Sequence, residues 1–373
     1  MTPFLESICA ICEINGASDV HLTTGQPPRF REHGQLVVRP EFPDPMPSQD
    51  VDEAAMELGL STLPIGCPDG TERVRATLMK KGSLDGAVSS ADGSRYRFNI
   101  YRESSKTAVA LRRLDSTFKT LEDLCLPENL ADFCNYTDGL VIVTGPTGSG
   151  KSTTLATLIH TINATRACHI ITIEDPVEFI HESEKALVHQ RQVGRDAESF
   201  NAALIDALRQ DPDVILVGEI RDLGTVRTAL RAAETGHLVF CTLHAGDCVG
   251  AVERFVSVFP PEEQTGVRRQ FAMALKGIVA QHLVLSSDGS SRYAVPEVMV
   301  NTPAVANLIA TGRTALISSS IETGTDAGMR SLEESLAELV LNECIDEELA
   351  YSMAHSQETL QRRLEEAVGD ELD

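Results

Sequence analysis

Residues 140–152 read LVIVTGPTGSGKS, an apolar run followed at once by a glycine-rich loop that ends in lysine and serine. The loop, residues 145–152, fits the Walker A pattern, in which glycines let backbone N–H groups turn inward around phosphate oxygens. The apolar run predicts a strand, and leucine and isoleucine at helical spacing predict a helix over residues 151–163. This order of strand, loop and helix is the context that a phosphate-binding loop requires.

The chemistry expected of the loop is the binding of ATP with Mg²⁺. Lys151 would reach the outer phosphate oxygens, and the hydroxyl of Ser152 would be a magnesium ligand. The predicted nucleotide-binding residues are Gly145, Pro146, Thr147, Gly148, Ser149, Gly150, Lys151, Ser152 and Thr153.

Two further strands are predicted to carry acidic residues to the same sheet edge. Residues 213–219 read DVILVGE, an apolar strand that delivers Glu219 at its carboxyl end, where open α/β sheets place their sites. Glu219 would act as a Walker B-like acid that orients Mg²⁺ or its water shell. Residues 173–178 read IEDPVE, and Glu174 is the candidate to polarise the attacking water.

Two histidines, His237 and His244, bracket the predicted strand at residues 238–243. A shared metal site is disfavoured, because strand ends seven residues apart lie roughly 20 Å from each other. His244, at the carboxyl end, is a candidate to sense the γ-phosphate, whereas His237 is expected to stabilise the fold or a subunit contact.

The rest of the chain predicts a second, smaller domain and further helices. Short alternating strands are expected within residues 18–38 and 82–114, so residues 1–114 are predicted to form an α+β domain. Residues 115–373 would form the parallel-sheet domain, with further strands at residues 170–173 and 214–217. A helix is expected after Pro261, with one face made of Val267, Phe271, Leu275, Ile278 and His282.

Phosphoryl transfer needs more positive charge than one lysine supplies. The candidates to reach a neighbouring subunit's nucleotide lie in the first domain. They are Arg95, Arg97, Arg112 and Arg113.

Composition excludes several classes of protein. A formal charge of -23 disfavours direct binding to nucleic acid, and no apolar run is long enough to span a bilayer, so any membrane contact would be peripheral. The odd number of scattered cysteines, 9 in all, indicates reduced cytosolic thiols. Cys9 and Cys12 form a CxxC pair with no second pair to complete a zinc site, and their spacing favours an apolar helix face.

Longer stretches resemble the secretion-ATPase superfamily, and among its members the PilT-type ATPases of type IV pilus retraction. The resemblance rests on the segments GASDVHLTTGQPPRFREHG, YRFNIYR, GPTGSGKSTTLATLIHTIN, HIITIEDPVEFIH, DALRQDPDVILVGEIRD and ALRAAETGHLVFCTLHAGD. It implies a PAS-like N-terminal domain joined to a RecA-like P-loop ATPase domain with a helical C-terminal region. It also implies a homo-hexameric ring at the cytoplasmic base of a pilus machine, against an inner-membrane platform protein.

The resemblance also implies roles for individual residues. Glu174 matches the catalytic glutamate, Glu219 matches the Walker B acid, and Arg97 and Arg112 match arginines supplied around the nucleotide. His237 and His244 match the two box histidines.

One segment departs from the family pattern. Where retraction ATPases carry an Ala-Ile-Arg-Asn-Leu-Ile-Arg-Glu motif, residues 304–311 read AVANLIAT, without the arginines and the glutamate. Two alternatives to a retraction motor therefore stay open, an accessory retraction ATPase and a DotB/TraJ-like ATPase of type IVB secretion or conjugation. A third alternative comes from another class, a nucleotide-binding ring component that hydrolyses little, and the intact Lys151, Glu174 and Glu219 argue against it.

Overall fold

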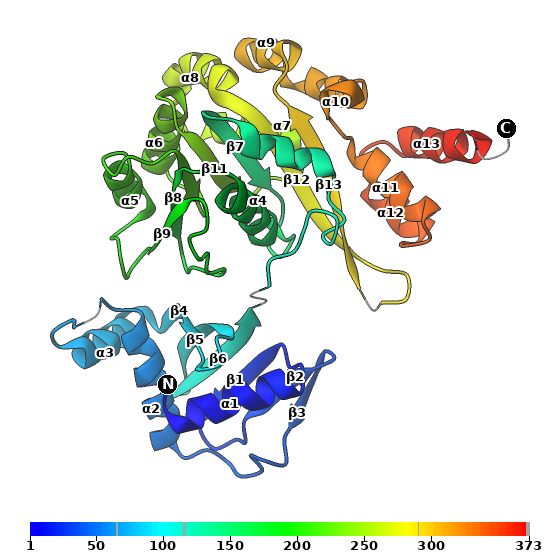
Figure 1. Ribbon diagram of the computed structural model, residues 1–373. Coiled ribbons are helices and arrows are strands. Elements are labelled where there is room, and N and C mark those ends of the chain that lie inside the picture. The colour runs from blue at the N-terminus through cyan, green and yellow to red at the C-terminus, as the bar shows by residue number, and fades with distance from the viewer. Residues whose placement is uncertain (65, 115–116, 290, 371–373) are drawn as a thin grey trace. The chain divides into compact units, whose positions relative to one another are not determined.

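The computed structural model describes residues 1–64, 66–114, 117–289 and 291–370, and it divides into two compact units (Figure 1). The first unit holds Met1–Thr117 with Glu174–Ile180 and Gln190–Ser199, and the second holds Phe118–Ile173, His181–His189 and Phe200–Asp373. The predicted boundary between residues 114 and 115 adjoins residues 115–116, which lie outside the described part of the chain, and it stays a prediction.

The first unit is built on an antiparallel sheet in the order β3-β2-β1-β6-β5-β4. Its strands are β1 (Asp19–Thr23), β2 (Arg29–Glu32), β3 (Gln35–Val38), β4 (Ser83–Ser89), β5 (Arg95–Glu103) and β6 (Lys106–Leu114). Its helices are α1 (Pro3–Ile14), α2 (Ser48–Ser61) and α3 (Gly70–Lys81). The strands predicted within residues 18–38 and 82–114 are confirmed, whereas helix α3 was not predicted.

Helix α1 carries the CxxC pair on its buried face. Cys9 and Cys12 are at most 1% exposed and pack with Leu5, Ile8 and Phe98 in the core of the first unit. Burial raises the pKa of the Cys9 thiol to about 12 and that of Cys12 to about 11. Thiols held neutral in this way are packing residues, as the spacing predicted.

The second unit contains a mostly parallel sheet in the order β13-β12-β7-β11-β10-β8-β9. Strands β7, β11, β10 and β8 are parallel to one another, β12 is parallel to β7, and β13 is antiparallel to β12. The strands are β7 (Gly139–Thr144), β8 (His169–Glu174), β9 (Leu187–Gln192), β10 (Val214–Val217), β11 (Leu238–Leu243), β12 (Leu275–Leu285) and β13 (Arg292–Val300). This arrangement confirms the predicted α/β fold class and the parallel strands around the glycine-rich loop.

Helices connect and cover the strands of this sheet. They are η1 (Glu128–Asn135), α4 (Lys151–Thr165), α5 (Phe200–Ala207), α6 (Leu223–Glu234), α7 (Cys248–Ser257) and α8 (Pro261–Ala274). The helix predicted over residues 151–163 is confirmed as α4.

The helix predicted to run through His282 is wrong in its second half. Helix α8 ends at Ala274, and residues from Leu275 onward form the long strand β12 (Figure 1). Strand β12 lies between β7 and β13 with most of its residues buried, so its apolar run is nearly continuous. Such a run matches helical spacing by chance, and periodicity alone cannot separate it from a buried helix.

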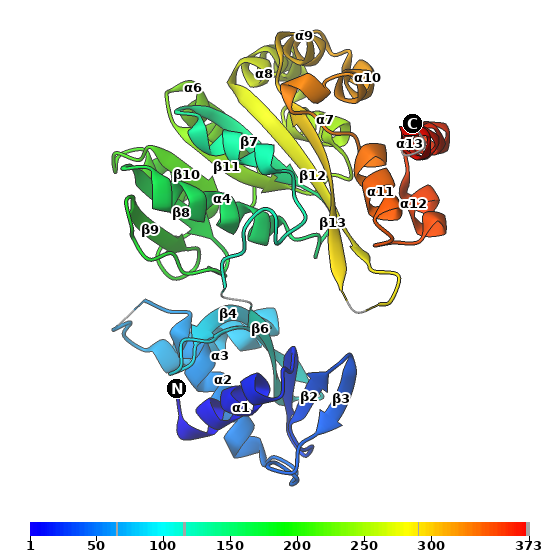
Figure 2. The same ribbon diagram turned by 45° about the vertical axis from the view of Figure 1, so that its right-hand side comes forward.

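The C-terminal region is mainly helical, as predicted. Figure 2 shows α11, α12 and α13 grouped beside the sheet. Helix α11 packs on β13, and its Leu332 and Leu336 belong to the same buried cluster as Val295 of β13. The elements are α9 (Pro303–Thr311), η2 (Thr314–Leu316), α10 (Ile317–Glu322), η3 (Thr325–Ala327), α11 (Leu332–Leu341), α12 (Glu347–Met353) and α13 (Gln357–Asp370).

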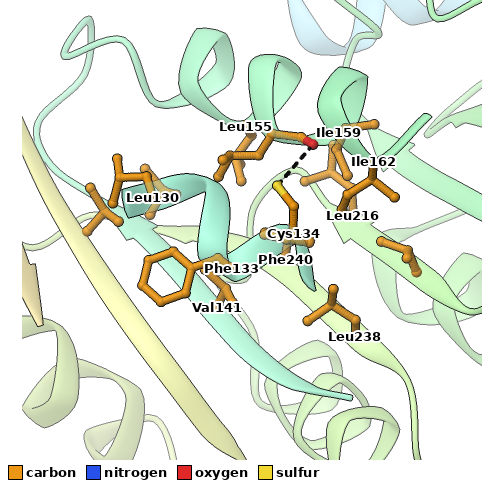
Figure 3. Packing of buried hydrophobic residues seen from close by; sticks show 14 of the residues in the cluster. Leu130, Phe133, Cys134, Val141, Leu155, Ile159, Ile162, Leu216, Leu238 and Phe240 are labelled. Carbon is orange, nitrogen blue, oxygen red and sulfur yellow. Dashed lines mark hydrogen bonds between the residues drawn. The ribbon is translucent and has the colours of Figure 1, made fainter. Parts of the chain in front are cut away.

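The core of the second unit joins η1, α4 and the central strands. Figure 3 shows Phe133 and Cys134 of η1 meeting Leu155 and Ile159 of α4 and Phe240 of β11. This core holds the central strands together, and the candidate site lies at their carboxyl ends.

Replacing Phe240 by alanine tests how much this core stabilises the protein. Phe240 is 0% exposed, so we expect Phe240→Ala to lower the free energy of unfolding by about 3–5 kcal/mol. Met273→Ala, at a side chain that is 73% exposed, should change it by less than about 0.5 kcal/mol. Because the chain has 0 tryptophans, circular dichroism in denaturant is the suitable measurement, and equal transitions for both variants would contradict this packing.

Candidate nucleotide-binding site

The glycine-rich loop connects β7 to α4. Strand β7 ends at Thr144 and α4 begins at Lys151, so residues 145–150 form the turn between them. Gly145 has φ +142° and Gly150, the N-cap of α4, has φ +89°, conformations that side chains rarely adopt. A Cβ atom on Gly145 would lie 2.2 Å from the main-chain oxygen of Gln281. Glycine is therefore required at both ends of the loop.

Lys151 lies folded into this loop. Its Nζ donates hydrogen bonds to the carbonyl oxygens of Gly145 (3.0 Å) and Pro146 (2.8 Å), and the residue is 9% exposed. Burial lowers the pKa of the Lys151 ammonium, while the charge of Glu219 acts in the opposite direction. In so poorly solvated a place, a positive charge attracts phosphate oxygens more strongly than it would in water.

The loop also contains an unused hydrogen-bonding group. Within the described part of the chain, the buried Oγ of Ser149 has no hydrogen-bond partner. Ser152, one residue into α4, is exposed, and Thr153 is half-buried. An orphaned hydroxyl, a buried ammonium and the N-terminus of α4 together fit an anionic phosphate chain.

The structure brings Glu219 and His244 together. Both follow carboxyl ends of neighbouring parallel strands, β10 and β11, in which Val217 pairs with Cys241. The Oε1 atom of Glu219 lies 2.9 Å from Nε2 of His244, and Arg221 forms a second ion pair with Glu219. The sequence analysis missed Arg221, although its place two residues after an acidic strand end could have indicated it.

Glu174 is the last residue of β8, and the structure assigns it to the first unit. Gln190 Nε2 lies 3.3 Å from its Oε1. The register between β8 and β10 continues to the strand ends, where Gly218 N donates to Ile173 O at 2.8 Å. Glu174 thus ends β8, and Glu219 comes two residues after β10, the neighbouring strand of the same sheet.

Three of the four predicted arginines form ion pairs inside the first unit. Arg97 Nη1 lies 3.6 Å from Glu178 Oε1, and Arg112 Nε lies 2.8 Å from Asp19 Oδ1. Arg113 pairs with Glu13 at 3.0 Å. A reach to a neighbouring subunit's nucleotide stays a prediction.

Arg95 and His237 have other surroundings. Arg95 donates to Val177 O at 2.5 Å, and burial lowers its pKa while the charge of Glu174 opposes this shift. His237 precedes β11 and its Nδ1 lies 3.0 Å from Ala232 O, at the opposite end of that strand from His244. His237 therefore holds the turn between α6 and β11, which fits the expected fold-stabilising role.

Sequence reasoning missed three polar residues beside the loop: Thr144, Gln281 and His282. Thr144 exchanges two hydrogen bonds with Ala245, and Gln281 is 3% exposed. The signal for Gln281 and His282 was their place as adjacent polar residues near the end of the apolar run at residues 275–285, which was hidden by the helical interpretation of that run. The signal for Thr144 was its place directly before the glycine-rich loop.

Comparisons with known proteins identify a family to which the chain is similar over most of its length. The model of the family "Type II/IV secretion system protein" matches residues 97–368. The chain is similar to the type IV pilus retraction ATPase PilT of Pseudomonas aeruginosa, with 39% identity over 94% of this chain and 98% of that protein.

Solved structures resemble the chain over a similar length. A crystal structure of the pilus retraction motor PilT with bound ADP has a TM-score of 0.85 at 37% identity and covers 96% of this chain and 99% of its own. An X-ray structure of the Legionella pneumophila ATPase DotB has a TM-score of 0.79 at 25% identity and covers 94% of each chain.

Proposed function

Because the chain belongs to the type II/IV secretion system protein family, we propose that it is an ATP-hydrolysing motor that drives type IV pilus retraction. The observation that carries the proposal is the intact phosphate-binding loop between β7 and α4, in a chain similar to PilT over nearly its whole length. The same loop accounts for ATP as the ligand.

We assign the binding of ATP to residues 145–153. Backbone N–H groups of the loop and the N-terminus of α4 would hold the phosphates, and Lys151 would leave its two carbonyl partners for the outer phosphate oxygens. Ser152 and Glu219 would hold Mg²⁺, which supplies positive charge to the phosphate oxygens when bound. Both offer oxygen atoms, the ligands that this ion prefers.

Hydrolysis itself is assigned to the acidic strand ends. Glu174 would orient and polarise the attacking water, as the carboxylate at the end of β8. His244 would form a hydrogen bond with the γ-phosphate and so sense its presence, and it already pairs with Glu219 at 2.9 Å. Arg97 and Arg112 would be supplied from the first unit to the nucleotide of an adjacent subunit.

The supply of arginines between subunits requires a neighbouring copy of the chain, and a homo-hexameric ring is the assembly that we propose. None of the described helices has the length and apolarity to cross a bilayer. We place the ring in the cytoplasm, peripheral at the inner membrane through a platform protein of the pilus machine, without direct contact to nucleic acid.

A second candidate function deserves a separate test because of helix α9. Ala306, Ala310 and Thr311 occupy the places where the retraction motif has charged residues, and the chain also resembles the ATPase DotB. An accessory retraction ATPase or a type IVB secretion or conjugation ATPase would tolerate this change. The higher TM-score and identity with PilT favour retraction.

Deleting the gene decides between these functions. We expect cells without the gene to carry excess surface pili and to lose twitching motility, and the wild-type gene to restore both. Counting pili by electron microscopy and measuring spreading on agar are sufficient. Unchanged pilus number together with lost secretion or plasmid transfer would overturn the retraction proposal.

A further inference from the structure

Strand β12 continues past the end of the strand beside it. Ala280 pairs with Thr144, the last residue of β7, whereas β12 runs on to Leu285. Gln281 and His282 therefore lie next to the phosphate-binding loop that starts at Gly145. Because neighbouring residues of a strand point to opposite faces, their side chains reach different parts of the site.

Gln281 contacts the loop at its beginning, at its end and at the first turn of α4. Its main-chain oxygen closes the space that a Cβ on Gly145 would need, and its Nε2 lies 2.8 Å from where a Cβ on Gly150 would stand. Its Oε1 accepts a hydrogen bond from Thr154 Oγ1 at 2.7 Å. Thr154 is 0% exposed, so each group would be left buried and unpaired without the other.

His282 holds the loop that follows β11. Its Nε2 donates to Gly246 O at 2.8 Å. Gly246 is two residues after His244, which contacts Glu219. From the other side, Thr144 Oγ1 donates to Ala245 O at 3.0 Å and accepts from Ala245 N at 2.8 Å. The position of His244 is thus set from β7 and β12 together.

We propose that Gln281 and His282 are positioning residues with separate tasks. Gln281 sets the shape of the phosphate-binding loop and thereby the affinity for nucleotide. His282 sets the position of His244 against Glu219 and thereby the rate of hydrolysis. The inference rests on the proposed ATP hydrolysis at this site. It adds that β12 positions both the phosphate-binding loop and the pair of His244 and Glu219.

The two tasks predict opposite kinetic signatures. A residue that shapes the loop for bound and reacting nucleotide alike changes KM and the nucleotide Kd with little change in kcat. A residue that acts through His244 and Glu219 lowers kcat with little change in Kd, because those groups act on the reacting phosphate.

The test uses variants at both positions in the full-length protein. We expect Gln281→Leu to weaken binding of a fluorescent ADP analogue and to raise KM for ATP by about tenfold, with kcat changed less than about twofold. We expect His282→Ala to lower kcat by about tenfold with Kd changed less than about twofold. His282→Gln, whose amide can donate from nearly the same place, should restore most of kcat.

A matched set of controls separates positioning from general destabilisation. Thr154→Val removes the same hydrogen bond from the other side, and the double variant with Gln281→Leu should bind nucleotide better than Gln281→Leu alone, because no unpaired group remains. If Gln281→Leu does not fold, Thr154→Val alone tests the hydrogen bond between Thr154 and Gln281, and it should also weaken nucleotide binding. Leu285→Ala, at a 57% exposed position of the same strand, should behave as wild type.

The outcomes distinguish this inference from the proposed function. If wild-type protein hydrolyses ATP but Gln281→Leu and His282→Ala change KM and kcat in the same proportion, or leave both unchanged, the separate tasks are refuted. If purified wild-type protein in any assembly state hydrolyses no ATP, the proposed function and the inference that rests on it are both overturned.

Discussion

Glu174→Gln should abolish ATP turnover while nucleotide binding persists. We expect kcat to fall by at least about 100-fold, because the amide keeps the size of the side chain but cannot accept a proton from water. The nucleotide Kd should change less than about threefold, since a group that orients the attacking water acts mainly in the transition state. Phosphate release and titration of a fluorescent ADP analogue measure the two quantities.

Another carboxylate of the chain provides the control for this variant. Glu184, whose side chain is 48% exposed and lies 3.7 Å from His160, is outside the proposed site. Glu184→Gln should keep wild-type turnover. Retained turnover in Glu174→Gln would refute the assignment of Glu174. Another acidic residue would then have to orient the attacking water.

Lys151→Ala should lose nucleotide binding itself. The ammonium is buried in the loop and is expected to exchange its two carbonyl partners for phosphate oxygens, so its removal takes away the main positive charge of the site. We expect Kd for ATP to rise by at least about 100-fold and turnover to disappear.

Lys185→Ala, at an exposed position of the same unit, is the matched control and should bind ATP as wild type does. Circular dichroism should show that both variants fold, because the Lys151 ammonium donates its hydrogen bonds to carbonyl oxygens of the loop and not to another element. Normal ATP affinity in folded Lys151→Ala would contradict the binding site.

Local chemistry explains why much of this site could be predicted from sequence. The loop between residues 145 and 150 is defined by glycines that its backbone conformation requires, and an apolar strand and a largely buried helix flank it. The meeting of Glu219 and His244 follows from another general rule, that the carboxyl ends of neighbouring parallel strands lie at one edge.

Strand β12 was predicted as part of a helix, for a physical reason. It is buried between β7 and β13, so its residues do not alternate between apolar and polar, and the buried run resembles a helix face. With that strand misassigned, Gln281 and His282 could not be recognised as neighbours of the loop. Only the register of β12 with β7 reveals them.

The roles of Arg97 and Arg112 could not be derived from the chain alone. Each pairs with a carboxylate of the first unit, Glu178 and Asp19 respectively, and such exposed pairs contribute little to stability. What these arginines do in a ring depends on a neighbouring subunit. Their assignment to the nucleotide therefore rests on the resemblance of this sequence to the secretion ATPases.

The central claim is that hydrolysis at this site retracts pili. Fluorescently labelled pili can be followed on single cells whose gene has been replaced by the Glu174→Gln allele, with the Glu184→Gln allele as control. We expect frequent retraction in wild-type and Glu184→Gln cells and extended pili that do not retract in Glu174→Gln cells. Normal retraction in Glu174→Gln cells that express the protein at wild-type level would contradict the claim.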